Sequence, residues 1–376
     1  MNQGLDNVVA ASTRLSEVDG EAGRLTIAGY AVDELAPAVT FEDVAYLLLH
    51  GHLPTDAERL TFARALAERR AISPATIALL RAAAAAGTPP MDALRMAAPT
   101  LSLGRREDPV EDAMTAIAAF PTIVGTYWRC RHGEEPVPIR YDIGHAAYYL
   151  HQLTGQEPTV ERARALETYL NTVCDHGLNA STFAARVIVS THSDVISAIA
   201  GAVGALKGPL HGGAPGPALD MVFQIGTPER AEPVIRAMLD RGERLMGFGH
   251  RVYRVRDPRA DVLAAAAERF YGADVDRSTY ELARHVEATA LRLLRERKPD
   301  RRLDTNVEFY TALVLHGIGL PTELFTPTFA VGRVVGWSAH CLEQLRNGRL
   351  IRPQSVYVGP TNLRFGVSGE IGVGVV

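Results

Sequence analysis

Four short stretches of this 376-residue chain interrupt apolar helical sequence with residue types that can transfer protons or bind anions. Imidazole and carboxyl groups exchange protons near neutral pH, and guanidinium groups match carboxylates and phosphates. Taken singly, each stretch also has a structural interpretation, because a lone histidine among apolar residues is more often hydrogen-bonded structure than a ligand. The four are Cys174-Asp175-His176-Gly177-Leu178-Asn179, Gly208-Pro209-Leu210-His211-Gly212-Gly213-Ala214, Met246-Gly247-Phe248-Gly249-His250-Arg251 running on to Arg254 and Asp257-Pro258-Arg259, and Asn306-Val307-Glu308-Phe309-Tyr310.

His211 differs from the other histidines because glycines surround it and let the backbone approach a ligand closely. A helix is expected to begin near Pro217, and its positive end would favour negative charge developing beside His211. We interpret nine further histidines as structural: His50, His52, His132, His145, His151, His192, His285, His316 and His340.

Two rival chemistries find little support in the spacing. Three histidines and a carboxylate could ligate zinc, but no H-x-x-x-H or H-E-x-x-H pattern connects them, so no metal site is predicted. Gly247-Phe248-Gly249 lacks the third glycine of a dinucleotide fingerprint, and no G-x-x-x-x-G-K-[ST] loop occurs.

The elements that must position these residues are mostly helices. Thr40 with Asp43, and Thr55 with Glu58, resemble capping boxes, and Ser73-Pro74 is a typical helix start. Gly51 is an expected stop, and a last helix is expected to close at Leu345 and Arg346 before Asn347-Gly348. The segments Thr13 to Val18 and Arg24 to Ile27, around Asp19-Gly20, predict a small hairpin. The predicted class is mainly α with a small N-terminal β-hairpin.

Composition limits the class of protein. The chain is 47% hydrophobic and 22% charged, which is ordinary globular composition, and its length suggests two or three folding units. A net charge of −4 does not point to nucleic acid or an anionic membrane. Three widely spaced cysteines, no leader-like N-terminal segment and no long apolar run lead us to expect a cytoplasmic protein.

Together and in this order, the stretches resemble the citrate synthase family, in its shorter bacterial form, which includes 2-methylcitrate synthases. The resemblance covers almost the whole chain. Its remaining motifs are Asp19-Gly20-Glu21, Arg24-Leu25, Gly29-Tyr30, Phe41-Glu42-Asp43-Val44-Ala45-Tyr46-Leu47-Leu48, Gly249-His250-Arg251-Val252-Tyr253, Phe325-Thr326-Pro327, Gly336-Trp337-Ser338-Ala339-His340 and Arg349-Leu350-Ile351-Arg352-Pro353.

The resemblance implies a two-domain helical homodimer whose subunits share their active sites. Residues 1–211 and 313–376 would form the large domain, and 212–312 a small mobile domain that closes over the substrates. The reaction implied is condensation of an acyl-CoA with oxaloacetate, followed by hydrolysis of the thioester. Coenzyme A arrives as a substrate, so no resident cofactor is implied.

The resemblance also assigns roles to residues. Glu308 would be the base that removes the acyl α-proton, His211 the donor to the thioester oxygen, and His250 the group that polarises the oxaloacetate ketone. Oxaloacetate would be bound by His176, Arg259, Arg333 and Arg352, with Arg352 reaching a neighbouring subunit's site. Coenzyme A would lie against Leu245, Gly247 and Gly249, with polar contacts from Arg254, Arg301 and Asn306.

One departure leaves three functions open. The family usually has Asp where this chain has Glu308, and the extra methylene moves the carboxylate by about one bond length. The leading hypothesis is a citrate synthase that uses acetyl-CoA. The alternatives are a 2-methylcitrate synthase that prefers propionyl-CoA, and a weakly active paralogue that binds oxaloacetate or citrate as a sensor.

Overall fold

The protein is mainly helical, as predicted. The computed structural model describes residues 3–5, 8–104, 108–212, 215–250, 252–273 and 277–362; Gly213, Ala214 and Arg251 of the sequence motifs lie outside these ranges. The helices are α1 (Val32–Leu35), α2 (Phe41–His50), α3 (Asp56–Ala67), α4 (Pro74–Ala85), α5 (Pro90–Ala97), α6 (Pro109–Arg131), α7 (His145–Thr154), α8 (Val160–Val173), α9 (Ala180–Val189), α10 (Val195–Leu206), α11 (Pro215–Ile225), α12 (Pro228–Asp240), α13 (Pro258–Ala273), α14 (Ser278–Arg297), α15 (Val307–Gly317) and α16 (Phe325–Asn347).

The local signals that predicted helix ends are confirmed. Thr40 and Thr55 each accept a hydrogen bond from the third helical N–H, and the carboxylates of Asp43 and Glu58 complete both capping boxes. Gly51 ends α2 with a φ of 86°, a conformation that costs a glycine little. The expected hairpin is present as β1 (Ser16–Asp19) and β2 (Arg24–Ile27), and a short third strand, β3 (Tyr30–Ala31), extends it.

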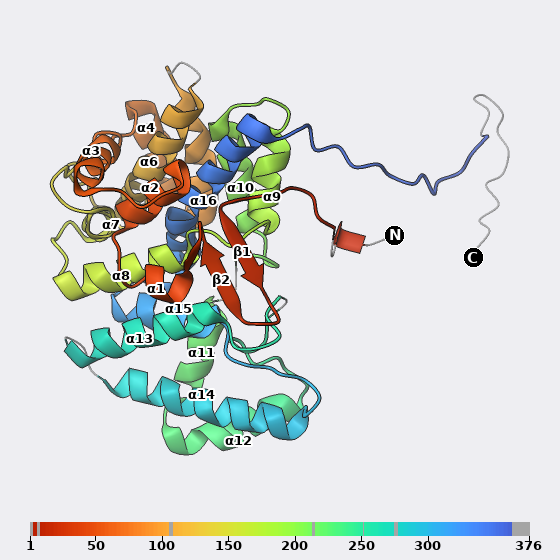
Figure 1. The fold of residues 1–376 in the computed structure, drawn as a ribbon. Helices are drawn as coiled ribbons and strands as arrows, with labels where there is room; N and C mark the ends of the chain where they lie inside the picture. Colours follow the sequence, from red (N-terminus) through yellow and green to blue (C-terminus); the bar gives the residue numbers. More distant parts are fainter. Residues whose placement is uncertain are drawn as a thin grey trace.

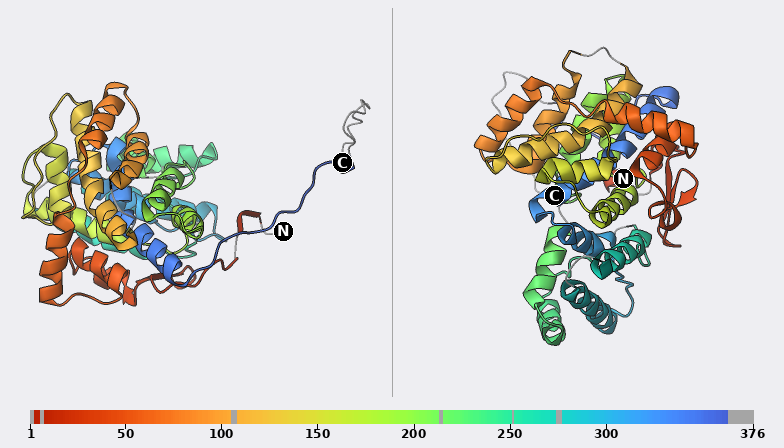
Figure 2. Two further views of the ribbon diagram at one scale, coloured as in Figure 1. Left: turned by 90° about the horizontal axis from the view of Figure 1, so that it is seen from above. Right: turned by 90° about the vertical axis from the view of Figure 1, so that its left-hand side faces the viewer.

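Helix α16 lies at the centre of the larger helical group (Figure 1). It packs against α6, α8, α9 and α10, and its buried side chains include Trp337 and Arg333. Helices α11, α12 and α14 are set apart at one end of the molecule, with α13 and α15 between them and the larger group, as the second view of Figure 2 also shows.

The segment that follows α16 leaves the body of the molecule. Residues 348–362 form no helix or strand, and the chain runs outward in both Figure 1 and Figure 2. Val356, Tyr357 and Val358 on this arm are 66%, 70% and 91% exposed, so a single copy of the chain leaves their apolar surface in water. Among the described residues, no helix combines the length and the apolar character needed to cross a bilayer.

Candidate active site

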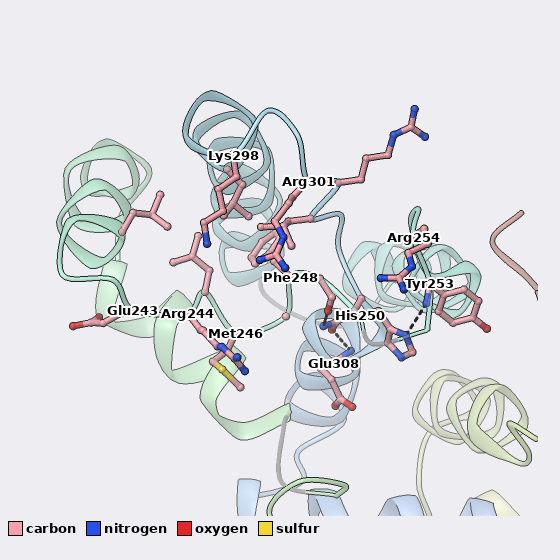
Figure 3. Close-up of a pocket in the computed structure, with 18 of the residues that line it drawn as sticks. Glu243, Arg244, Met246, Phe248, His250, Tyr253, Arg254, Lys298, Arg301 and Glu308 are labelled. Carbon is pink, nitrogen blue, oxygen red and sulfur yellow. Dashed lines mark hydrogen bonds between the residues drawn. The ribbon is translucent and has the colours of Figure 1, made fainter. Parts of the chain in front are cut away.

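A cavity of about 1100 Å³ opens between the ends of α12 and α14 and the loop that joins α12 to α13. In Figure 3, His250, Tyr253 and Glu308 lie on one side of this cavity, and Arg244, Met246 and Lys298 on the other. The lining residues named in the argument below are Leu245, Gly247, Phe248, Gly249, Arg254, Arg301, Arg302 and Asn306.

Five cationic side chains line the cavity, and none of them pairs with a carboxylate of the described residues. In the part of the chain that the structure describes, no carboxylate lies within 4 Å of these groups, although most other arginines on α12 and α14 are paired. Unpaired cations around one cavity favour a ligand with several negative charges, such as a chain of phosphates. The five are Arg244, Arg254, Lys298, Arg301 and Arg302.

The floor of the cavity is a backbone platform held by Asn306. Its N–H donates to the Gly247 carbonyl at 2.9 Å, and its side-chain Nδ2 donates to the Gly249 carbonyl at 2.7 Å. Its Oδ1 caps α15 by accepting from the Glu308 N–H at 3.0 Å. A Cβ on Gly247, whose φ is 86°, would lie 2.9 Å from the Cβ of Phe309, so the platform depends on glycine there. Asn306 therefore shapes the site through both ends of its amide, and its second Nδ2–H forms no hydrogen bond to the described residues.

Glu308 stands in the first turn of α15 with a carboxylate that forms no hydrogen bond to the described residues. Burial raises its pKa to about 7, and the nearby charges of Arg259 and Arg333 only partly offset that effect. A carboxyl group with a pKa near neutrality is both available as a base and strong enough to be useful as one.

Hydrogen bonds fix the tautomer of His250. Its Nδ1 accepts from the backbone N–H groups of Val252 at 3.0 Å and Tyr253 at 3.1 Å, so its proton must lie on Nε2. Arg259 Nη2 lies 3.4 Å from that Nε2, which sets two donors face to face. Burial, then the Arg259 charge, lowers the pKa of His250 to about 4, so the ring is neutral at pH 7. An oxygen acceptor placed between the two donors would satisfy both.

His211 is held in the opposite tautomer. The N–H of Ser181, in the first turn of α9, points at His211 Nε2 from 3.3 Å, and the Ser181 hydroxyl lies 2.8 Å from the same atom. Because a backbone N–H can only donate, Nε2 is an acceptor and Nδ1 carries the proton. Burial and the Arg333 charge lower the pKa of His211 to about 4. A neutral histidine backed by a helix N-terminus is a hydrogen-bond donor suited to an oxyanion.

The helix that supports His211 is α9, whereas the sequence had suggested the helix after it. The expected helix begins at Pro215, close to the predicted Pro217, and residues 213 and 214 between it and His211 lie outside the described ranges. The N-cap of α9 is Asn179, which accepts from the Thr182 N–H and from the Ser181 hydroxyl. This support was not identified from the sequence, although Asn179-Ala180-Ser181-Thr182 is a typical helix start.

Two buried arginines differ in how their charge is balanced. Arg259 forms an ion pair with Asp257 through Nη2 at 2.8 Å and Nε at 3.0 Å. Arg333 is 1% exposed, and no carboxylate among the described residues lies within 4 Å of it. Its Nε donates to the Val173 carbonyl at 2.5 Å, and burial lowers its pKa to about 10. A buried guanidinium without a direct partner indicates an anion site.

His176 lies close enough to Arg259 and Arg333 to be affected by both charges. Its Nε2 lies 3.1 Å from the Tyr253 hydroxyl, and its ring centroid is 6.0 Å from that of His250. Burial, followed by the charges of Arg259 and Arg333, holds the pKa of His176 well below its ordinary value. The three sequence-predicted groups His176, His250 and Arg259 are thus neighbours, and the Arg333 charge acts on His176, His211 and Glu308 alike.

Not every predicted residue lies on the cavity wall. His250 and Glu308 line it together with all six residues predicted for coenzyme A, whereas His176, His211, Arg259 and Arg333 do not. Arg352 is exposed, on the arm that follows α16. The described residues contain no group of three or more His, Cys, Asp or Glu side chains that could hold a metal ion.

Comparison with known proteins places these residues in a family. The family model "Citrate synthase, C-terminal domain" matches residues 4–354. Citrate synthase 2 of Bacillus subtilis is 40% identical over 370 residues, covering 96% of this chain and 97% of that protein. Citrate synthase of Haloferax volcanii is 39% identical over 377 residues, covering 97% of each.

Solved structures agree with the sequence comparison. Citrate synthase from Pyrobaculum aerophilum has a TM-score of 0.87 and 38% identity, with 96% of this chain and 93% of that chain covered. The ternary complex of the Thermoplasma acidophilum enzyme with carboxymethyl coenzyme A and oxaloacetate has a TM-score of 0.84 and 30% identity, covering 97% and 98%.

Proposed function

This chain belongs to the citrate synthase family, and we propose that it condenses acetyl-CoA with oxaloacetate and hydrolyses the product to citrate and coenzyme A. The observation that carries the proposal is the pair of neutral histidines in opposite tautomers, together with a carboxyl group of pKa about 7. Enolisation of a thioester and addition to a ketone need one base and two neutral donors, which is what Glu308, His211 and His250 supply.

In the first step, the ionised Glu308 removes a proton from the α-carbon of acetyl-CoA. The electron pair moves toward the thioester oxygen, where the Nδ1–H of His211 donates a hydrogen bond. Because His211 is already neutral and its Nε2 is engaged by Ser181, it stabilises the enol or enolate without a change of tautomer.

In the second step, the enol carbon attacks the ketone carbon of oxaloacetate. The ketone oxygen becomes an alkoxide, which the Nε2–H of His250 and the Nη2 of Arg259 stabilise by hydrogen bonds. The alkoxide takes a proton through His250 Nε2, and the proton that Glu308 removed in the first step replaces it, so His250 ends neutral and Glu308 ends ionised. Arg259, Arg333 and His176 bind the two carboxylates of oxaloacetate, with Arg352 of the neighbouring subunit completing the set. Water then cleaves the thioester of the citryl-CoA formed, releasing citrate and coenzyme A.

The cavity is proposed to take coenzyme A. Its phosphates would lie against the unpaired cations, and the platform from Leu245 to Gly249 would receive the adenine. In this proposal Arg254, Arg301 and Asn306 act as polar contacts, and Asn306 also shapes the platform through its bonds to Gly249 and Glu308. Arg244, Lys298 and Arg302 join the predicted contacts.

Residues 212–312 are proposed to move as a small domain on the large domain formed by 1–211 and 313–376. This movement would bring the cavity, which residues 239–308 line, onto His211 and Arg333. The exposed apolar arm and Arg352 support a homodimer with shared sites. Three free thiols suit a reducing compartment, so the proposal places the protein in the cytoplasm.

The proposal is tested by measuring release of the coenzyme A thiol in the presence of oxaloacetate. The purified protein should turn over acetyl-CoA faster than propionyl-CoA, in keeping with the names of its relatives. Dominant turnover of propionyl-CoA would instead make it a 2-methylcitrate synthase. A folded protein that releases no thiol from either would contradict the proposed reaction.

Exchange of Glu308 for Asp tests whether the site is built around the longer side chain. Shortening the base moves its carboxylate by about 1 Å, and we expect kcat to fall roughly 100-fold. The same thiol assay at saturating substrates measures it. An increase in kcat would show that Glu308 impairs the reaction and would favour the weakly active paralogue.

A further inference from the structure

A series of hydrogen bonds between polar side chains ends directly beside His176. Asp175 is fully buried, and its Oδ2 accepts from the Ser16 hydroxyl at 2.5 Å and from His340 Nε2 at 3.2 Å. The same Ser16 hydroxyl oxygen accepts from the Gly177 N–H at 2.8 Å. Ser16, in the first position of β1, therefore bonds to the residues on both sides of His176.

The hydrogen bonds from both ends of this series point toward the Asp175 carboxylate. Arg186 is 2% exposed, and its Nε donates to His340 Nδ1 at 2.9 Å. Because a guanidinium only donates, His340 must carry its proton on Nε2, and that proton can go only to an acceptor. The carboxylate of Asp175 is that acceptor. Glu343 and Gln344 hold the remaining nitrogens of Arg186, so its orientation is fixed as well.

Close packing holds the turn that contains Cys174 and Asp175 against α16. A Cβ on Gly336 would lie 2.3 Å from the Cys174 carbonyl oxygen and 2.8 Å from Asp175 Oδ1, so only glycine lets the turn approach this closely. Arg333 lies one helical turn before Gly336 and His340 one turn after it, on the same face of α16. Asp175 also supplies the negative charge that most supports the Arg333 guanidinium.

We propose that Ser16, Asp175, His340 and Arg186 are positioning residues, which fix the turn that carries His176 and thereby set the affinity for oxaloacetate. This inference rests on the proposed function. None of the four lines the coenzyme A cavity, so their effect should be confined to the oxaloacetate half of the site.

Ser16→Ala is the sharpest test because it removes one hydroxyl from a half-buried position on a short strand. Ser16→Ala loses both the bond to the buried Asp175 carboxylate and the bond from the Gly177 N–H, and it should raise the Kd for oxaloacetate about tenfold. That Kd is measured by calorimetric titration without acetyl-CoA. The KM for acetyl-CoA and kcat at saturating oxaloacetate should stay within about twofold, since the catalytic groups are unchanged.

Two variants serve as controls. Ser16→Thr keeps the hydroxyl and suits a strand, so it should restore the Kd of the unaltered protein. Ser197→Ala removes a serine–aspartate hydrogen bond of similar length, 2.6 Å to Asp194, at the exposed start of α10, and should leave the Kd unchanged.

His340→Asn interrupts the same series of hydrogen bonds at a second point. The shorter amide can still accept from Arg186 but is too short to reach Asp175. The Kd for oxaloacetate should rise, and the Ser16→Ala/His340→Asn double variant should lose less than the product of the two single effects because both bonds end on one oxygen.

The outcomes separate this inference from the proposed function. If the unaltered protein binds no oxaloacetate, both fail. If it binds oxaloacetate but Ser16→Ala binds equally well, the positioning role is wrong. The same holds if Ser16→Ala lowers the unfolding temperature while the constants of both substrates stay unchanged, because the four residues then serve only the stability of the fold. An equal rise in the constants of both substrates would also overturn the inference.

Discussion

At the scale of single residues, the raised pKa of Glu308 sets the working pH range. The proposed base acts only when ionised, and burial raises its pKa to about 7. His211 and His250, with pKa values lowered to about 4, keep their neutral form throughout this range. The fall in activity on the acidic side of the pH profile should therefore come from protonation of Glu308 alone.

We accordingly predict that kcat/KM for acetyl-CoA falls as the pH drops through about 7, by about tenfold per pH unit below it. The profile is measured by following thioester loss, with the fold checked by circular dichroism at each pH. A limb centred near the ordinary glutamate value of 4.5 would contradict a buried, perturbed base.

The raised pKa of Glu308 also predicts that ionisation of this carboxyl group lowers the stability of the fold. The folded-state pKa of Glu308 lies above its unfolded value, so its contribution to stability is complete below about 4.5 and is lost as the pH rises through about 7. Glu308→Gln cannot ionise, and it should raise the unfolding temperature at pH 8 while changing it little at pH 4. Calorimetric melting at both values checks this. A variant that is less stable at pH 8 would mean that the ionised carboxylate has partners.

Residue types could be predicted from the sequence, but proton positions could not. The candidate set His211, His250 and Glu308 followed from the family resemblance. The tautomer of His211 depends on Ser181, thirty residues earlier, and that of His250 on two backbone N–H groups, so both need the fold. Asn306 was predicted to contact coenzyme A and lines the cavity, but its bonds to Gly249 and Glu308, which shape the platform, could not be predicted from the sequence.

At the scale of elements, helix ends were predictable because capping is local. Thr40, Thr55 and Ser73 bond to N–H groups within three residues, so the pattern and the cause lie in one window. The face of α16 that supports the site was not predictable in this way. Trp337 on that face donates to the Ser181 hydroxyl at 3.1 Å, across 156 residues of sequence.

The start of α9 should therefore matter for catalysis as well as for stability. Asn179→Ala removes the N-cap and the acceptor of the Ser181 hydroxyl, which should cost about 1 kcal/mol in the free energy of unfolding. It should also lower kcat, because Ser181 holds His211 in its tautomer. Urea unfolding and thiol release measure the two effects.

Thr55→Ala is the matched control, because it removes the N-cap of α3, far from the site. It should cost a similar free energy of unfolding without a change in kcat. If Asn179→Ala also leaves kcat unchanged, the α9 terminus is not part of the catalytic support.

At the scale of the whole molecule, the predicted site is divided between places that one chain does not bring together. Arg352 lies on an exposed arm, while Arg259 and Arg333 are buried and His176 is half-buried. Gln344 Nε2 donates to the Arg349 carbonyl, and the Ile351 N–H donates to Ser190, so the base of the arm is anchored and its direction away from the body is set. In the proposed homodimer, a second copy would cover this arm.

The division of the site predicts complementation between two inactive variants. Arg352→Gln and His211→Gln should each abolish most activity as homodimers. When the two are unfolded, mixed in equal amounts and refolded, half of the dimers should be hybrids, and each hybrid should hold one complete site made from His211 of one chain and Arg352 of the other. Activity should then return to about a quarter of the unaltered level. Refolding each variant alone is the control. If Arg352 acted within its own chain, every site in the mixture would lack one group and no activity would return.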